Sequence, residues 1–353
     1  MNELMKRLKS ATKLKGAGEI KQSKVFLPKE MSPTPVPMLN VALSGSLNGG
    51  VTPGLTVLAG PSKHYKSSFA LLMAAAFLNK HPDGILLFYD SEFGITPEYL
   101  ETAGIDMDRT FHIPIMDIEE LKFDLMHKLE KEIDKTGKDK VFILIDSIGN
   151  LASKKEREDA ISEKSVADMT RAKMLKGLFR MVTPYLATRD IPLVAINHTY
   201  KEQSLFPKDI VSGGTGIYYS ANTIFIIGRQ QEKKGTIVEG YNFILNVEKS
   251  RFVKEKSKIP ILVTWEGGVS LASGLLEIAL EAGFVTKPSN GWYAKVDQET
   301  GEIGEKARLT ETREISWWTD ILQNEKFAEC VENAYKINAQ SNFDPGEIEA
   351  IDE

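Results

Sequence analysis

One stretch, Gly60-Pro61-Ser62-Lys63-His64-Tyr65-Lys66-Ser67, constrains the fold of this chain more than any other. It follows an apolar run, Leu55–Ala59, and precedes an alanine- and leucine-rich stretch with a helical pattern, Ser68–Asn79. A strand, a loop and a helix in this order form a phosphate-binding loop, in which backbone N–H groups converge on an anion. We therefore expect Lys66 to reach the β- and γ-phosphates of a nucleotide and the Ser67 hydroxyl to hold Mg²⁺.

Tyr65 stands where the usual form of such a loop has a second glycine. If the backbone needs a positive φ at this position, a tyrosine is an uncommon resident. By itself the stretch also fits a strand, a turn and a helix with a chance Lys-Ser pair. Further motifs have to decide between the two interpretations.

The composition limits the class of protein. With 353 residues, of which 42% are hydrophobic, the chain can build a large core plus appendages, and global disorder is excluded. Its single cysteine, Cys330, cannot form an internal disulfide, which favours a reducing compartment. Residues 1–10 lack the apolar core of a signal peptide, and no apolar run approaches the roughly 20 residues of a membrane helix. The net charge of −5 leaves any nucleic-acid binding to local basic clusters.

From Met38 onward, short β-rich runs alternate with helical stretches. Several of these runs are apolar throughout, as parallel strands covered on both faces are. The pattern predicts an α/β fold of βαβ units, with a central, mostly parallel sheet flanked by helices. The predicted strands are Leu55–Ala59, Ile85–Tyr89, Val141–Ile145, Leu193–Ile196 and Thr223–Ile227, then Tyr241–Val247 and Ile259–Trp265 as neighbouring hairpin strands, and Leu275–Ala282 is predicted to be helical.

Shifts in composition divide the chain into four parts. Residues 1–37 form an N-terminal arm and linker, in which an amphipathic helix over residues 1–18 is followed by four prolines. Residues 1–24 carry seven Lys or Arg against two Glu, so the helix fits a membrane surface or another subunit; the apolar run Lys24–Leu27 could add to a sheet edge. Residues 38–270 form the core, 271–340 a small C-terminal domain and 341–353 an acidic tail.

Three more strands end in polar residues at the carboxyl edge of the predicted sheet, where α/β folds bind ligands. Asp146 ends one strand and is placed beside the metal. Glu92 follows another, and we expect it to deprotonate a water for attack on the γ-phosphate. His198 follows a third and is placed to hydrogen-bond the γ-phosphate. Each alone is also an ordinary strand-end residue, but with Lys66 in the same chain they form a set.

These motifs resemble the RecA family of recombinases, and within it the phage T4-type branch. The likeness spans nearly the whole chain, from the arm to about Tyr335. The phage branch also carries an aromatic residue before the loop lysine, which accommodates Tyr65. The signatures are Gly60–Ser62 with Lys66 and Ser67, Tyr89–Glu92, Ile145–Ser147, Ala195–His198 and Ser212–Gly216.

The resemblance implies a RecA-like core that holds ATP and Mg²⁺ between adjacent subunits of a helical filament on single-stranded DNA. It assigns Glu92 to water activation, and His198 replaces the glutamine with which bacterial members sense the γ-phosphate. Lys249 and Arg251 match the basic pair that reaches the neighbour's ATP, although five bases and one acid in residues 249–258 also fit a solvated basic face. The implied nucleotide-binding set is Gly60, Pro61, Ser62, Lys63, His64, Tyr65, Lys66, Ser67, Ser68, Tyr99, which stacks on adenine, and Asp146, which shares the metal with Ser67.

Two loops should line the filament axis in this family, one over about residues 153–166 and one over about residues 199–216. Loops rich in lysine and glycine suit a phosphate backbone that is bound without reading its bases. Four interleaved acids make a solvated helix the plainer interpretation of the first loop, and only the resemblance reverses it. The predicted DNA-binding residues are Lys154, Lys155, Arg157, Lys164, Arg171, Lys173, Lys176, Lys201, Phe206, Lys208, Gly213 and Gly214.

The expected function is a DNA-dependent ATPase that polymerises on single-stranded DNA and pairs it with homologous duplex DNA in recombination, repair and replication. It would act in the cytoplasm of a host cell, with loader and single-strand-binding proteins as partners. Two alternatives stay open. A hexameric ring helicase on the same core would need an interface rotation that closes. A mediator would bind ATP and DNA without exchanging strands, and the presence of both Glu92 and Lys66 argues against it.

Overall fold

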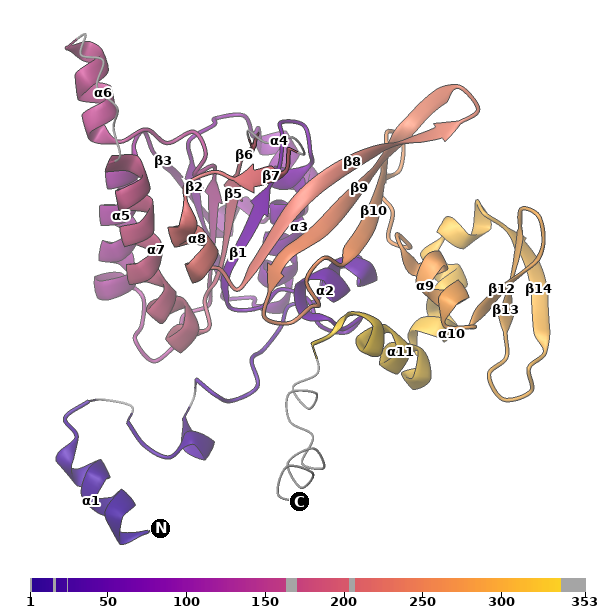
Figure 1. The fold of residues 1–353 in the computed structure, drawn as a ribbon, viewed down its shortest axis with the longest axis horizontal. Coiled ribbons are helices and arrows are strands. Elements are labelled where there is room, and N and C mark those ends of the chain that lie inside the picture. The colour runs from indigo at the N-terminus through magenta and orange to yellow at the C-terminus, as the bar shows by residue number, and fades with distance from the viewer. Residues whose placement is uncertain (1, 15–16, 24, 163–169, 203–206, 338–353) are drawn as a thin grey trace, which may run out of the picture.

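A central sheet organises the computed structural model, which describes residues 2–14, 17–23, 25–162, 170–202 and 207–337 (Figure 1). Within these residues the sheet has nine strands in the order β11-β10-β9-β8-β1-β5-β4-β2-β3. The strands from β8 to β3 are parallel, and β9, β10 and β11 extend the sheet antiparallel. The strand bounds are β1 Gly54–Ala59, β2 Ile85–Asp90, β3 Thr110–Pro114, β4 Val141–Asp146, β5 Pro192–Asn197, β8 Thr223–Lys234, β9 Ile237–Ser250, β10 Lys258–Thr264 and β11 Gly268–Val269.

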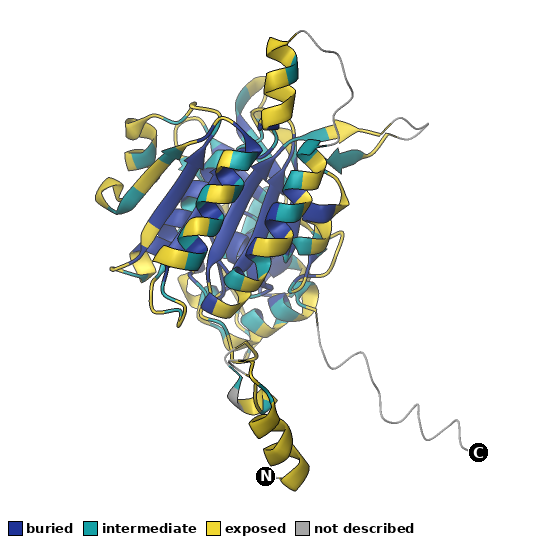
Figure 2. Cartoon of the chain, turned by 90° about the vertical axis from the view of Figure 1, so that its left-hand side faces the viewer, coloured by how far each residue is buried: buried dark blue, intermediate teal, exposed yellow. Residues whose placement is uncertain are grey.

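Helices cover both faces of this sheet, which confirms the predicted mostly parallel α/β fold. Alternate residues of one strand point to opposite faces: Leu58 of β1 packs in the cluster with α2 and α3, whereas Val57 packs in the cluster with α5 and α7. Figure 2 looks onto the α5 and α7 face, where buried strands lie behind helices with exposed outer sides. The helices of the core are α2 Pro37–Ser44, α3 Lys66–Lys80, α4 Pro97–Thr102, α5 Ile118–His127, α6 Lys154–Ile161, α7 Thr170–Arg189 and α8 Thr215–Ser220, with the short turns η2 Met107–Arg109 and η3 Lys128–Glu132.

The strand β3 was not predicted from the sequence. It lies at the edge of the sheet and pairs only with β2 among the described strands. Its residues are mostly exposed, so it lacks the continuous apolar run that marks the inner strands. The strands β6 (Thr199–Lys201) and β7 (Asp209–Val211), which form a small hairpin outside the main sheet, were also not predicted. They too lack a continuous apolar run.

The N-terminal arm differs from the sequence prediction. Its helix, α1 (Glu3–Ala11), is shorter than the predicted 1–18, because Thr12 takes an extended backbone conformation. None of the α1 residues is buried. After the 3₁₀ turn η1 (Ile20–Gln22), residues 25–27 form an exposed turn and no strand in this chain. The linker is tied to the core from Lys29 onward, where the Lys29 Nζ lies 2.6 Å from the Asp190 carboxylate.

The C-terminal region builds a second, smaller sheet, with β12 (Val285–Ser289), β13 (Trp292–Val296) and β14 (Ile303–Arg308) antiparallel. It packs with α9 (Leu275–Glu281), α10 (Thr319–Leu322), α11 (Glu325–Tyr335) and the turns η4 (Glu311–Arg313) and η5 (Ile315–Trp318). Arg313 forms an ion pair with Glu232 of β8, which joins this region to the long β8–β9 hairpin. The predicted acidic tail, residues 341–353, lies outside the described residues. None of the helices that the structure describes is long and apolar enough to cross a membrane.

Candidate active site

The loop between β1 and α3 has the conformation of a phosphate-binding loop. Lys66 is the first residue of α3, and its Nζ donates hydrogen bonds to the carbonyl oxygens of Gly60 (3.0 Å) and Pro61 (2.8 Å). These bonds fold the ammonium group back over the loop, at the N-terminal end of a helix, where anions bind. Burial lowers the pKa of Lys66, and the nearby carboxylates of Glu92 and Asp146 oppose this shift.

Tyr65 takes the left-handed backbone conformation that glycine favours, with φ at 61°. Its ring stacks on Phe243 at a centroid distance of 5.1 Å and meets Phe69 edge-on at 5.4 Å. Aromatic pairs of this kind contribute about 0.5–1.5 kcal/mol each, and a left-handed residue other than glycine costs about 1–2 kcal/mol. The two aromatic contacts therefore offset the backbone strain, which explains how a tyrosine can stand at this position.

Two oxygen ligands suited to Mg²⁺ meet below the loop. The Ser67 hydroxyl donates a hydrogen bond of 2.7 Å to Oδ2 of Asp146. The other oxygen, Oδ1, is buried and has no hydrogen-bond partner among the described residues. Burial, with the added repulsion of Glu92 and Asp90, raises the pKa of Asp146 to about 6. A divalent cation would satisfy the orphaned oxygen and favour the charged carboxylate, and Mg²⁺ prefers hard oxygen ligands, so these residues fit the ion.

Glu92 is held in place from both its backbone and its side chain. The buried Asp90 carboxylate accepts hydrogen bonds from the N–H groups of Glu92 (3.0 Å) and Phe93 (2.8 Å), which fixes the turn after β2. Oε1 of Glu92 accepts from the Ser147 hydroxyl at 2.7 Å and from Nδ2 of Asn150 at 3.0 Å. Sequence reasoning gave no role to these two donors, although both closely follow Asp146, the acid at the end of β4.

His198 comes next to the same carboxylate. Its Nε2 lies 3.4 Å from Oε1 of Glu92 and donates a hydrogen bond of 3.0 Å to Oδ1 of Asn150. Glu92, Asn150 and His198 thus form one connected group at the carboxyl ends of β2, β4 and β5. The structure brings the predicted base and the predicted γ-phosphate sensor together, with Asn150 between them.

A cavity of about 460 Å³ joins these residues. The loop residues from Ser62 to Ser68 line one part, and Glu92, Tyr99 and His198 line another. The Tyr99 hydroxyl is hydrogen-bonded to the Ser68 hydroxyl. The lining residues missed from the sequence include Arg229 of β8, Tyr241 of β9 and Trp265, which follows β10, because these segments are remote from the loop along the chain.

Arg229 and its aromatic neighbours close the side of this cavity. The Arg229 guanidinium lies 4.5 Å from the ring centroid of Tyr241 and donates a hydrogen bond of 3.2 Å to the carbonyl of Lys63. Tyr241 in turn packs edge-on against Trp265 at 5.4 Å. A cation stacked on an aromatic wall therefore supports the outer part of the phosphate-binding loop.

The predicted fingers, Lys249 and Arg251, do not line this cavity in their own chain. Nζ of Lys249 donates a 2.6 Å hydrogen bond to the Tyr218 carbonyl and lies 5.4 Å from the centre of the Tyr218 ring. Burial, followed by repulsion from Arg251, lowers the pKa of Lys249. Their predicted action on another subunit's nucleotide stays a prediction.

The predicted DNA loops begin at the same edge of the sheet, where α6 and the β6–β7 hairpin project (Figure 1). Lys154 and Lys155 are exposed at the start of α6, whereas Arg157 pairs with the buried Asp117 at 2.6 Å. Arg171 donates to the carbonyls of Ile148 (2.9 Å), Gly149 (2.9 Å) and Leu151 (2.7 Å), so it braces the root of the first loop.

The remaining DNA candidates are spread over α7 and the hairpin. Lys201 pairs with Asp209 across the hairpin at 2.9 Å, and Gly213 and Gly214 have positive φ. Lys173, Lys176 and Lys208 are exposed. Lys164 and Phe206 lie outside the described residues.

The strain at Tyr65 can be measured with a matched pair of variants. Tyr65→Gly and Tyr65→Ala both lose the contacts with Phe69 and Phe243, but only alanine keeps the left-handed strain. We expect both variants to be less stable than the wild type in urea unfolding. The free energy of unfolding of Tyr65→Ala should be about 1 kcal/mol lower than that of Tyr65→Gly. A Tyr65→Gly variant more stable than the wild type would show that the aromatic contacts do not offset the strain.

The raised pKa of Asp146 predicts a pH-dependent stability. The native carboxyl binds its proton more tightly than the unfolded one, whose pKa is near 3.8, so the protonated group stabilises the fold at low pH and this contribution is lost as the pH rises through about 6. In buffer with a metal chelator, Asp146→Asn should therefore unfold at higher urea than the wild type at neutral pH. The difference should disappear near pH 4, and a constant difference would contradict the raised pKa.

Comparisons with known proteins agree with this geometry. The family model of the RecA N-terminal domain matches residues 8–269, and the model of the C-terminal domain of the bacteriophage T4 recombination and repair protein (UvsX) matches residues 272–331. The recombination and repair protein of Enterobacteria phage T4 is 49% identical over 344 residues, which cover 96% of this chain and 87% of that protein.

Bacterial relatives are more distant. Protein RecA of Pseudarthrobacter chlorophenolicus is 25% identical over 338 residues, 93% of this chain and 90% of the relative. Protein RecA of Tropheryma whipplei is 26% identical over 303 residues, 84% of this chain and 64% of the relative. The resemblance expected from the motifs is confirmed, and the chain belongs to the RecA family of recombinases, in the branch of the phage T4 recombination and repair protein.

Proposed function

We propose that this recombinase hydrolyses ATP in a DNA-dependent reaction and, as a helical filament on single-stranded DNA, pairs that strand with homologous duplex DNA. The observation that carries the proposal is the single connected group of Glu92, Asn150 and His198. Glu92 and His198 line the cavity proposed for the nucleotide, and Asn150 and His198 precede the two predicted DNA loops. A nucleotide site and a DNA surface that share residues are what a DNA-dependent ATPase requires.

The side chains of the cavity divide the chemistry of phosphoryl transfer to water. Lys66 and the N–H groups of the loop bind the β- and γ-phosphates, while Ser67 and Asp146 hold Mg²⁺, which neutralises charge on the phosphates. Glu92 takes the proton of the attacking water, and the turn fixed by Asp90 sets its position. Tyr99 and Trp265 line the same cavity, and their rings are proposed to stack on the base of the nucleotide.

Two further residues are proposed to complete the site of a neighbouring subunit. Lys249 and Arg251 lie outside the cavity of their own chain, so a head-to-tail contact is needed to bring them to a γ-phosphate. There they would stabilise the charge of the transition state, as an arginine finger does in trans. A contact of this kind repeats along a filament when its rotation does not close into a ring.

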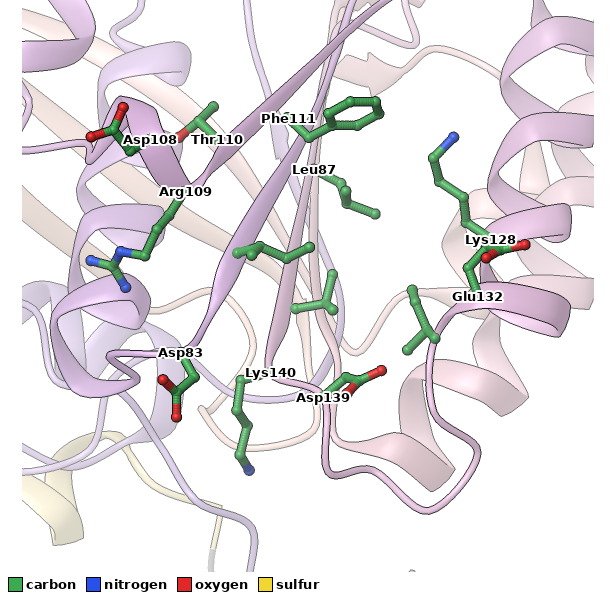
Figure 3. Close-up of a pocket in the computed structure, with 13 residues that line it drawn as sticks. Asp83, Leu87, Asp108, Arg109, Thr110, Phe111, Lys128, Glu132, Asp139 and Lys140 are labelled. Atoms are coloured by element: carbon green, nitrogen blue, oxygen red, sulfur yellow. The ribbon is translucent and has the colours of Figure 1, made fainter.

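The arm and the β3 edge supply the two sides of a second proposed contact between subunits. Phe26 is 67% exposed in the arm. A cavity of about 590 Å³ lies beside β3, and its lining includes Leu87, Arg109, Phe111, Lys128 and Glu132 (Figure 3). Since the outer edge of β3 pairs with none of the described strands and the arm has an unburied apolar stripe, we assign the arm of a second copy to this surface, with Phe26 as its anchor.

Two substitutions test the proposed reaction. Lys66→Ala should abolish ATP hydrolysis without unfolding the protein, because it removes the proposed phosphate contact and, within the protein, only hydrogen bonds to two carbonyls of the loop. Glu92→Gln should keep ATP binding, lower the rate by about 10²–10⁴-fold and trap the filament on DNA. Hydrolysis would be followed by phosphate release with and without single-stranded DNA, and pairing by strand exchange with a fluorescent oligonucleotide. Normal hydrolysis in Glu92→Gln would remove Glu92 from the mechanism.

The filament contact is tested by truncation just before Lys29, which spares the ion pair with Asp190. The truncated chain should stay monomeric in light scattering at concentrations at which the full chain polymerises. Phe111→Ala should weaken assembly, whereas Ile303→Ala, an equally exposed apolar residue of β14 at 59%, should leave it unchanged. Equal masses for the full and truncated chains would rule out the arm as the polymerising element.

A further inference from the structure

Asn150 lies between Glu92, the proposed general base, and His198, the proposed γ-phosphate sensor. It donates a hydrogen bond to the first and accepts one from the second. Its Nδ2 donates to Oε1 of Glu92 at 3.0 Å, and its Oδ1 accepts from Nε2 of His198 at 3.0 Å. An amide nitrogen only donates and an amide oxygen only accepts, so Nε2 of His198 carries the proton of this bond. That N–H is the donor which His198 would offer to a γ-phosphate.

Gly149 brings the imidazole of His198 this close. A Cβ atom at Gly149 would lie 2.3 Å from Cδ2 of His198 and 3.1 Å from its Cγ, so the ring packs directly against the backbone of the first loop's root. The Arg171 guanidinium holds the carbonyl of Gly149, at 2.9 Å, which fixes that root. Gly149 and Arg171 thus set where Asn150 can meet the ring.

His198 also lies at the point where the second predicted DNA loop joins the core. The Ser212 N–H donates to the carbonyl of His198 at 3.0 Å, and Nδ2 of Asn197 donates to the carbonyl of Ser212 at 2.7 Å, so both ends of the loop are joined here. Between them lies the β6–β7 hairpin, whose strands include Lys201. A change of partner by His198 therefore acts at the point where the whole hairpin is attached.

We propose that Asn150 is a positioning residue that competes with the γ-phosphate of ATP for the Nε2–H of His198. The inference rests on the proposed function, because it needs ATP beside Glu92. A phosphate oxygen is the stronger acceptor, since hydrogen bonds to ionised acceptors are about twice as strong as neutral ones. ATP takes the proton donor away from Asn150, whereas ADP, which lacks the γ-phosphate, leaves it there. The hairpin is thus held to the first loop with ADP and released with ATP.

The test compares two variants that break different bonds of Asn150. Alanine removes the acceptor for His198, so the ADP complex should bind a labelled single-stranded oligonucleotide about three- to tenfold more tightly, the range for one hydrogen bond. Aspartate keeps and strengthens that acceptor while losing the donor to Glu92. Asn150→Asp should therefore weaken binding with a non-hydrolysable ATP analogue. Fluorescence anisotropy would give the ratio of the ADP and analogue affinities for each variant.

Two controls separate this switch from a general loss of structure. Gly149→Ala pushes the ring away from Asn150 and should change the affinity ratio in the same direction as Asn150→Ala. In a His198→Ala background, Asn150→Ala should have no further effect on the ratio, because the shared bond is already gone. Additive effects, or the same direction for alanine and aspartate at position 150, would overturn the proposal.

The affinity of the wild type for single-stranded DNA, measured with ADP and with the ATP analogue, distinguishes a failure of this inference from a failure of the proposed function. If this affinity is the same with ADP and with the analogue, ATP does not control DNA binding and the inference fails, whereas the proposed function stands as long as single-stranded DNA stimulates phosphate release. If the wild type distinguishes the nucleotides and Asn150→Ala distinguishes them equally well, only the role of Asn150 is wrong.

Discussion

The parallel register of four neighbouring strands is the constraint on which the rest of the structure depends. Ala59 pairs with Asn197, Ile145 with Ala195, and Asp90 with Asp146, so β1, β5, β4 and β2 end at one edge of the sheet. Lys66, Ser67, Glu92, Asn150 and His198 all follow closely after these ends. A shift of one residue in any pair would turn the strand-end side chains to the opposite face.

Charged groups that are energetically unfavourable to bury lie together at this edge of the sheet. Asp146 is almost fully buried, and its pKa is raised to about 6, yet one of its oxygens has no hydrogen-bond partner within the part of the chain that the structure describes. Lys66 is also buried, and its ammonium is satisfied by two carbonyls of the loop. Charges of this kind suit the proposed exchange of their present partners for a nucleotide and its metal, and groups with a perturbed pKa gather at functional sites.

The same edge also explains how DNA and nucleotide can influence one another. Glu92 accepts hydrogen bonds from Ser147 and Asn150, which precede the first predicted DNA loop, and it lies 3.4 Å from His198, which precedes the second. Arg171 was predicted to contact DNA, but its guanidinium donates hydrogen bonds to carbonyl groups at the root of the first loop. Arg171 therefore holds the root of the first loop in a fixed position beside Glu92.

The sequence by itself determined the inner strands, the phosphate-binding loop and the acids at the strand ends, because continuous apolar runs and short motifs are local signals. It failed at β3, whose edge position leaves it mostly exposed, and at the length of α1. Only the tertiary structure decided that Tyr65 is held in a left-handed conformation by Phe69 and Phe243, that Arg229 reaches the loop from β8, and that Asn150 lies between Glu92 and His198. These contacts join residues far apart along the chain, and their geometry follows from strand register and side-chain packing, which no local pattern records.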